Sequence, residues 1–251
     1  MPKRLFALLL TILAGAALAT GSATAEPSIV GGTAADQPYP FVVSLHSPSG
    51  TVSCAGSLIA PAWVATAAHC VYGKAPSTVA LRLGSNESDQ GGETAQAAEF
   101  IVHPHFNVKT HTGDLALIRL TAAAQTTPIA LGDTAAPGEA TRILGWGQTC
   151  PAPDCGPLPS SLQQLDTQLV EGSKCTAAFD GTAELCTDNP GGKNGSCYGD
   201  SGGPELTRDG DHWTLVGLTS RPGNGSVTCA TAPSIYTSVV AYAPWIAEKT
   251  G

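Results

Sequence analysis

GDSGGP, residues 199–204, places Ser201 among glycines, and two shorter stretches precede it in the chain: TAAHC at 66–70 and DLAL at 114–117. Each stretch alone has a structural explanation, because a single histidine is often a packed core group and a serine beside glycines suits a tight turn. Together they supply a hydroxyl, an imidazole and a carboxylate, the three groups that nucleophilic catalysis by serine requires.

The three side chains would have distinct roles in such chemistry. A protonated serine hydroxyl is a poor nucleophile, so we expect His69 to take its proton as general base and to return it to the leaving group. The apolar run at residues 115–120 indicates a buried strand, so Asp114 at its start would be buried too. A buried carboxylate can orient the imidazole by bonding to its far ring nitrogen, and this is the role we assign to Asp114. The glycines beside Ser201 would let backbone N–H groups point at the negative charge that develops on a substrate oxygen.

The composition favours a β-rich domain, since the 251 residues include 29 glycines and 19 prolines and only 13% are charged. The formal net charge is −8 and no run of Lys or Arg follows residue 4, which argues against nucleic-acid binding and against a polybasic membrane patch. Apolar or alternating segments predict strands at 41–46, 57–60, 63–66, 79–83, 100–102, 115–120, 142–144, 162–170, 213–219 and 234–237. This pattern favours antiparallel barrels or a sandwich over a βαβ fold.

Further short motifs extend the pattern: IVGG at 29–32, VHP at 102–104, GWG at 145–147 and Ser220 shortly after Gly217. In this order the motifs resemble the trypsin/chymotrypsin-like serine protease family over residues 29–251. The resemblance implies an all-β, trypsin-like fold of two packed six-stranded antiparallel Greek-key barrels, at approximately 29–135 and 136–238, with a C-terminal helix at 239–249. It also implies a secreted serine endopeptidase that hydrolyses peptide bonds through an acyl-enzyme formed on Ser201.

The resemblance assigns roles to further residues near the nucleophile. The backbone amides of Gly199 and Ser201 would form the oxyanion hole. The amino group created by cleavage before Ile29 would pair with the carboxylate of Asp200 and complete that hole, so the full chain would be an inactive precursor, a zymogen.

The first 28 residues are expected to be removed. Lys3 and Arg4 precede an apolar run and an A-x-A pattern at 23–25, which is typical of a signal peptide at 1–25. A membrane anchor is the alternative, but the apolar run is shorter than the roughly 20 residues that a span needs. Cleavage there would leave 26–28 as a short pro-segment on an exported protein.

All eight cysteines follow this segment, and an even count in an oxidising compartment favours disulfides. Structural zinc is the alternative, but only Cys150 and Cys155 are close in sequence and no C-x-x-C pair occurs. By resemblance the pairs are Cys54–Cys70, Cys175–Cys186 and Cys197–Cys229, which leaves Cys150 and Cys155 to close a local loop.

The resemblance also places a primary specificity pocket, formed by Gly195, Ser196, Tyr198, Ser220, Arg221, Pro222 and Ser234. Gly195 would be its floor, where cleavage after Lys or Arg normally needs an acid; an uncharged pocket would leave a cationic side chain without a partner. We therefore expect cleavage after neutral apolar residues, as in chymotrypsin- or elastase-like enzymes. Arg221 raises the alternative of a glutamyl-preferring protease, and Pro222 lacks an N–H for an extended substrate.

Two other classes of protein also fit parts of the sequence. GDSGG matches G-x-S-x-G, the nucleophile elbow of α/β-hydrolases, but that fold needs an acid and then a histidine after the serine. Only His212 follows Ser201, with too few residues between them for the intervening strands. A catalytically silent binding protein on the protease scaffold is the second alternative, although all three catalytic side chains are present.

No cofactor and no catalytic metal are predicted. Oxygen ligands at Asn86, Glu87, Asp89 and Glu93 would suit a structural calcium ion, although a charged surface turn is the simpler interpretation. The expected partners are protein or peptide substrates and protein inhibitors of proteases, without nucleic acid or membrane, and the enzyme is expected to be a monomer.

Overall fold

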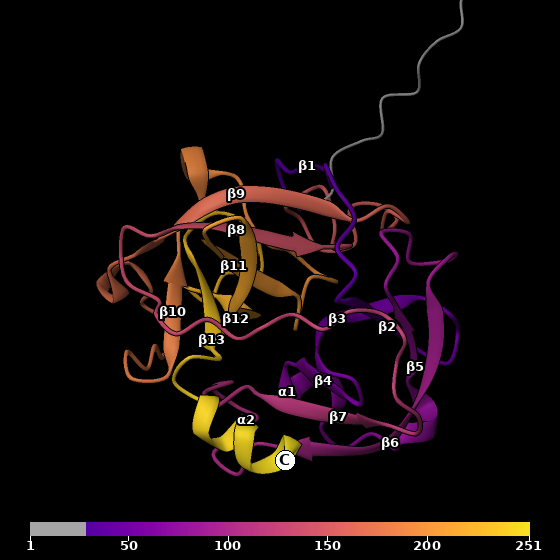
Figure 1. Ribbon diagram of the computed structural model, residues 1–251. Coiled ribbons are helices and arrows are strands. Elements are labelled where there is room, and N and C mark those ends of the chain that lie inside the picture. Colours follow the sequence, from indigo (N-terminus) through magenta and orange to yellow (C-terminus); the bar gives the residue numbers. More distant parts are fainter. Residues whose placement is uncertain (1–28) are drawn as a thin grey trace, which may run out of the picture.

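The computed structural model describes residues 29–251, so the predicted signal peptide (1–25) and pro-segment (26–28) lie outside the described residues. The described chain forms two closed antiparallel β-barrels that pack against each other, followed by a short helix (Figure 1). This architecture confirms the all-β, two-barrel fold. It excludes the α/β-hydrolase alternative, whose nucleophile lies on a strand-to-helix turn.

The first barrel contains six strands in the hydrogen-bonded order β2-β3-β4-β7-β6-β5, with β5 returning to β2. They are β2 (Val42–His46), β3 (Val52–Ala60), β4 (Trp63–Thr66), β5 (Ala80–Leu83), β6 (Glu93–Val102) and β7 (Ala116–Leu120). The barrel interior is aliphatic, and Leu58, Leu81 and Ile118 are fully buried in it. Closure pairs both edges of each strand, which removes the open edges that invite aggregation.

The second barrel contains six strands in the order β9-β10-β13-β12-β11-β8, and pairing of β8 with β9 closes it. They are β8 (Ala140–Gly145), β9 (Gln163–Val170), β10 (Glu184–Thr187), β11 (Pro204–Asp209), β12 (His212–Pro222) and β13 (Ser234–Ser238). A seventh strand, β1 (Thr33–Ala34), pairs with the start of β9. The segment that follows residue 29 therefore packs on the second barrel, although it precedes the first barrel in sequence.

The C-terminal helix begins later than the sequence predicted. We expected it at 239–249, but α2 spans Ala243–Thr250. The N–H of Val239 still donates to the carbonyl of Val216 on β12, and a turn separates this residue from the helix, whose first turn contains Pro244. The rings of Tyr242 and Trp245 pack on His103 at 4.6 and 4.9 Å. The helix thus lies against the first barrel near β6 and β7 (Figure 1).

The remaining helices are short: α1 (Ala68–Val71) and the 3₁₀ turns η1 (Pro76–Thr78), η2 (Gly172–Lys174) and η3 (Pro190–Gly192). Within residues 29–251, no helix combines the length and the apolar character that crossing a membrane demands.

Three strands escaped the sequence patterns: β1, β10 and β11. β10 has only four residues, and β11 begins at Pro204, within the GDSGGP motif that resembles a turn. Proline is tolerated there because the first residue of a strand does not need its N–H in the ladder. β6 also begins at Glu93, whereas the sequence predicted a strand only from residue 100. The stretch ETAQAAE was missed because it has few residues of high β-propensity, but it pairs with β5 in the structure.

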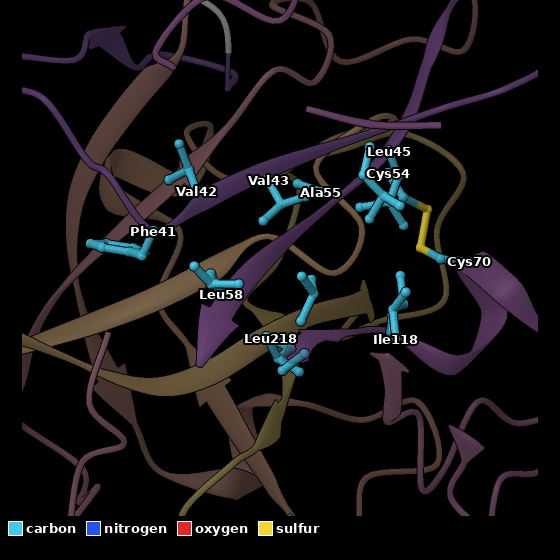
Figure 2. Packing of buried hydrophobic residues seen from close by; sticks show 14 of the residues in the cluster. Phe41, Val42, Val43, Leu45, Cys54, Ala55, Leu58, Cys70, Ile118 and Leu218 are labelled. Carbon is cyan, nitrogen blue, oxygen red and sulfur yellow. A yellow bond between two sulfur atoms is a disulfide. The ribbon is translucent and has the colours of Figure 1, made fainter. Parts of the chain in front are cut away.

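The hydrophobic core is continuous across the two barrels. Phe41, Val43 and Leu58 of the first barrel lie near Leu218 of β12 in the same buried cluster (Figure 2). Leu144 of β8 and Trp146, just after that strand, belong to this cluster too. The barrels are therefore fixed relative to each other by shared apolar packing, which keeps any site between them in register.

Four disulfides, Cys54–Cys70, Cys150–Cys155, Cys175–Cys186 and Cys197–Cys229, account for all eight cysteines, as predicted. Cys54–Cys70 ties β3 to α1 (Figure 2). Bonds of this kind typically contribute about 2–4 kcal/mol each to stability. The pairing overturns the zinc alternative, because no thiol is left to bind a metal among the described residues.

A buried acid makes the stability of the second barrel depend on pH. Glu205 is fully buried on β11, and burial raises its pKa to about 7, although hydroxyl donors from Thr187 and Thr141 oppose this. Because the folded pKa lies above the unfolded value, the folded state holds a proton that the unfolded state has lost. Stability from this group is complete below about pH 4 and is lost as pH rises through 7.

We predict that Glu205→Gln stabilises the protein at high pH, because the amide is neutral and the two threonine hydroxyls can rotate to suit it. At pH 8 the gain should be roughly 2–3 kcal/mol, and at pH 4 it should vanish. Denaturant unfolding at both pH values checks this in a Ser201→Ala background that prevents self-digestion. Asp209→Asn, at an exposed position on the same strand, is the control; equal stability of Glu205→Gln and wild type at pH 8 would contradict the prediction.

Candidate active site

Asp114 lies between the two barrels and accepts hydrogen bonds from both. Its carboxylate has 0% exposure. Oδ1 accepts from the backbone N–H of His69 at 2.9 Å, and Oδ2 lies 2.7 Å from both His69 Nδ1 and the donating Ser220 hydroxyl. Thr237 of β13 also donates to the Asp114 carbonyl oxygen at 3.0 Å. Burial opposes the charged form, but the bonds from His69 and Ser220 outweigh it and hold the pKa of Asp114 below its ordinary value.

His69 is positioned by the short helix α1, which follows β4 directly. The next residue, Cys70, is bonded to Cys54 on β3, so the turn is attached to the barrel wall. The side chain of His69 is 21% exposed, whereas its Asp114 partner is buried. With Nδ1 facing the carboxylate, Nε2 is the nitrogen left to exchange a proton with a group in the cavity.

The loop that carries Ser201 is bonded to both barrels. The N–H of Ala55 on β3 donates to the Ser201 carbonyl at 2.7 Å, and the N–H of Gly202 donates to Thr219 on β12 at 2.8 Å. Gly202 has a φ of 75°, and a Cβ there would overlap the Thr66 hydroxyl and the Ala55 carbonyl. Only glycine fits at this position, which explains part of the GDSGGP motif.

The two amides expected to form an oxyanion hole flank Asp200. Gly199 has a φ of 101°, a conformation that side-chain-bearing residues rarely adopt. Neither the Gly199 amide nor the Ser201 amide donates a hydrogen bond to an acceptor within residues 29–251. Both donors are thus available for an oxygen atom of a bound molecule.

His69 and Ser201 line one cavity of about 270 Å³. The cavity also contains most of the residues predicted for the specificity pocket: Ser196, Tyr198, Ser220, Arg221, Pro222 and Ser234. Gly195 does not line it. The Gly195 N–H bonds to the Val30 carbonyl at 2.9 Å, and Ala230 lies over Gly195 and lines the cavity in its place.

Apart from Arg221, His69 and His111, the residues that line the cavity are uncharged. The Ser196 hydroxyl donates to that of Ser234 at 3.2 Å, and the Cys197–Cys229 disulfide forms part of the wall. None of the lining residues, all within the described part of the chain, carries a carboxylate. Such a cavity can accept an apolar or neutral polar group without leaving a charge unpaired.

Arg221 lines the cavity, but its charge is already paired. Its guanidinium bonds to both oxygens of Glu184, at 2.8 and 2.9 Å, and the two side chains are only 10% and 1% exposed. Sequence reasoning missed Glu184, since nothing in its four-residue strand distinguishes it from a surface acid. It also missed His111, whose ring stacks on His69 with centroids 5.1 Å apart.

Ile29 and Asp200 are both buried in the second barrel. The side chain of Ile29 is 1% exposed and packs with Ile143 and Tyr236. The Asp200 carboxylate accepts the N–H groups of Gly147 at 2.7 Å and of Cys197 at 2.8 Å. Burial raises the pKa of Asp200 to about 7, and these two bonds only partly oppose it.

Three of the four side chains considered for calcium, those of Asn86, Glu87 and Glu93, accept hydrogen bonds within the protein. Asn86 accepts from the Tyr39 N–H, Glu87 accepts from the Ser161 hydroxyl, and Glu93 accepts from the N–H groups of residues 125 and 126. These bonds occupy the oxygens with donors from three other segments of the chain, which favours a structured surface turn.

His69, His111 and Asp114 bring potential metal-ligand atoms within 4.8 Å of one another. However, Oδ2 of Asp114 already bonds to Nδ1 of His69 and to the Ser220 hydroxyl, and Oδ1 accepts from the backbone N–H of His69. The two imidazole planes are nearly parallel, at 6°, so their in-plane lone pairs do not converge. The cluster is better suited to proton transfer than to metal binding.

Two closed barrels with an aspartate, a histidine and a serine at their junction define the serine-type endopeptidases of the chymotrypsin fold. A family model described as Trypsin matches residues 29–246, and the chain belongs to this family. It is therefore a serine-type endopeptidase that acts on protein or peptide substrates. Family membership and the four disulfides indicate an extracellular protein.

We predict that Asp114→Asn disables the enzyme without unfolding it. An amide accepts on its oxygen only, and the backbone N–H of His69 can only donate, so the amide oxygen would stay opposite that N–H. The NH2 group would then face Nδ1 of His69 and force the imidazole into the wrong tautomer. kcat should fall about 10⁴-fold, the loss known for proteases of this type, with KM little changed. Steady-state kinetics on a chromogenic peptide measures this, with Asp209→Asn as control; a loss below tenfold would contradict the proposed role of Asp114.

Proposed function

We propose that the protein hydrolyses peptide bonds through an acyl-enzyme on Ser201, with His69 as general base and Asp114 as the residue that orients it. The observation that carries this proposal is the 2.7 Å contact between a buried carboxylate and an imidazole that shares a cavity with the serine. The amides of Gly199 and Ser201 would stabilise the oxyanion. Labelling of Ser201 by an organophosphonate, and its loss in Ser201→Ala, tests the nucleophile directly and separates a protease from a silent binding protein.

The cavity has no acid in its lining and its one guanidinium is paired, which supports a preference for neutral apolar residues on the acyl side of the cut bond. A Lys or Arg side chain would lose its hydration there without gaining an acidic partner. The ion pair with Glu184 speaks against the glutamyl alternative, because Arg221 is already neutralised and lies in a rigid set of contacts. The enzyme is accordingly chymotrypsin- or elastase-like in preference.

We expect matched peptides with Phe or Leu at the cleaved position to be hydrolysed at least 10-fold more efficiently than those with Arg or Glu, since an unpaired buried charge costs several kcal/mol. kcat/KM values for the four peptides, measured with the mature enzyme, check this. Ser201→Ala provides the blank for contaminating proteases. Faster cleavage after Arg or Glu would contradict a neutral pocket.

The protein is proposed to be exported by the signal peptide at 1–25 and to mature by cleavage before Ile29. Asp200 supports the cleavage before Ile29, because its carboxylate is fully buried between two N–H donors and has no cation beside it among residues 29–251. A new amino group at Ile29 would supply that charge and shape the loop that carries the amides of Gly199 and Ser201. The mature form would act as a monomer and be open to protein inhibitors.

N-terminal sequencing of active, secreted material should therefore give IVGG, residues 29–32. Material that retains residues 26–28 should bind a substrate-like phosphonate at least 100-fold more slowly, because its oxyanion site lacks the ion pair with Asp200. Full activity in a preparation that begins at Glu26 would refute the zymogen mechanism while leaving the three catalytic side chains unaffected.

A further inference from the structure

One of the four disulfides is open to solvent, the bond between Cys150 and Cys155. Cys155 is exposed and Cys150 is half-buried, whereas the six cysteines of the other three bonds are each at most 8% exposed. A disulfide is reduced when a thiolate reaches one of its sulfur atoms, so access decides which bond reacts. A small thiol in solution can therefore reach this bond and is kept away from the other three.

The same bond closes the shortest loop. Its cysteines are 5 residues apart, against 11, 16 and 32 for the other pairs. The loop-closure entropy that a disulfide removes from the unfolded chain is smallest for a short loop, so this bond contributes least to the stability of the fold. Residues 151–157 are all exposed, and none of them belongs to a buried hydrophobic cluster. The bond can thus open without unfolding either barrel.

The ring that this bond closes, residues 150–155, contacts the wall of the cavity that His69 and Ser201 line. The Pro151 carbonyl accepts from the N–H of Cys229 at 2.8 Å, and the Cys150 carbonyl oxygen lies 3.6 Å from Sγ of Cys197. Cys197 and Cys229 are buried, and both line the cavity. If the ring opens and moves, the N–H of Cys229 loses its acceptor, which is unfavourable for a buried donor. The ring and the cavity wall are therefore coupled.

The segment that follows the ring packs on the loop that carries the nucleophile. A Cβ at Gly199 would lie 3.3 Å from both methyl groups of Leu158, so these two residues are in close contact. Gln148 joins the same two segments, because its backbone N–H donates to the Tyr198 carbonyl at 2.8 Å and its side chain donates to the Gly156 carbonyl at 3.4 Å. Movement of the ring would thus reach the Gly199 amide, one of the two proposed oxyanion donors.

We propose that Cys150–Cys155 is a redox-sensitive modification site: a low-molecular-weight dithiol reduces it in the folded enzyme, and the opened ring slows catalysis by loosening the Gly199 amide and the cavity wall. This inference goes beyond the proposed function, although the expected loss of catalysis rests on the roles proposed for Gly199 and Ser201.

The dithiol supplies both electrons that the reaction needs. One of its thiolates attacks Sγ of Cys155, the exposed residue of the pair, the S–S bond breaks, and Cys150 leaves as a thiolate that takes a proton from water. The second thiolate then attacks the reductant's own sulfur in this mixed disulfide, which releases Cys155 as a second thiol and leaves the reductant as a cyclic disulfide. Exchange with glutathione disulfide reverses the reaction and restores the bond.

Selective reduction is tested first, on mature enzyme that carries Ser201→Ala and so does not digest itself. Brief treatment with dithiothreitol without denaturant, followed by N-ethylmaleimide and peptide mass spectrometry, should label Cys150 and Cys155 at least 10-fold faster than any other cysteine. The three buried disulfides are internal controls in the same chain and buffer. Labelling of a buried cysteine at an equal rate, or no labelling of Cys150 and Cys155, refutes the proposal.

The effect on catalysis is measured on mature wild type before and after the same treatment. We expect kcat per titrated active site to fall about 10-fold, less than the roughly 10²- to 10³-fold that loss of a whole oxyanion donor costs, and to recover fully with glutathione disulfide. Active-site titration with an organophosphonate counts competent molecules, so partial unfolding would lower the number of sites and leave kcat per site unchanged. An unchanged kcat per site after complete reduction of Cys150–Cys155 would overturn the proposal.

The double variant Cys150→Ser with Cys155→Ser removes the bond permanently and is the matched control. It should have the lowered kcat from the start and should not respond to dithiothreitol; a further loss on treatment would assign the effect to another disulfide and contradict the proposal. If this variant does not fold, the reversible loss in wild type provides the same test. Failure of the catalytic assignment is distinguishable, because untreated wild type would then not be labelled by the phosphonate at Ser201, whereas selective reduction of Cys150–Cys155 would still occur.

Discussion

One carboxylate at the junction of the barrels sets the geometry on which the site depends. Asp114 is completely buried, and such a charge is stable only when its oxygens are occupied by donors. The donors come from both sides: His69 from the first barrel and Ser220 from the second. A relative shift of the barrels by about an ångström would therefore leave a buried charge short of a donor, so the electrostatics of one side chain constrain the packing of the whole molecule.

The surrounding covalent and apolar contacts keep that junction in place. Cys54–Cys70 ties the turn of His69 to β3, and β3 in turn donates through Ala55 to the carbonyl of Ser201. Leu218 of β12 lies in the hydrophobic cluster of the first barrel (Figure 2). The proposed nucleophile, Ser201, and the proposed base, His69, are therefore both attached to β3, so their separation depends on one short piece of rigid backbone.

The sequence was most informative where chemistry restricts the choice of residue. Position 202 has space only for glycine, and Asp114 stands at the start of a buried strand. Both constraints leave a mark in the sequence, as the motifs GDSGGP and DLAL. Strands β10 and β11 were not, because four residues carry little periodicity and a strand that starts at Pro204 resembles a turn. The neighbours of the site were hidden for a different reason: Glu184 and Arg221 are 37 residues apart, and their pairing exists only once β10 and β12 flank β13.

The second barrel contains three buried carboxylates that differ in what faces them. Glu184 has a guanidinium, Glu205 has two hydroxyls, and Asp200 has two backbone amides. The latter two have pKa values raised to about 7, so both carry uncompensated charge in neutral or alkaline surroundings. Each buried charge without a cation destabilises the folded state. An amino group that proteolysis places beside Asp200 would remove this cost for Asp200 and leave it for Glu205. Maturation would then stabilise the barrel most at pH values above the pKa of Asp200, where the carboxylate is ionised, and below the pKa of the new amino group, about 8 in an unfolded chain, where the amine is charged. The proposed cut that forms the oxyanion site would thus also strengthen the fold that holds it.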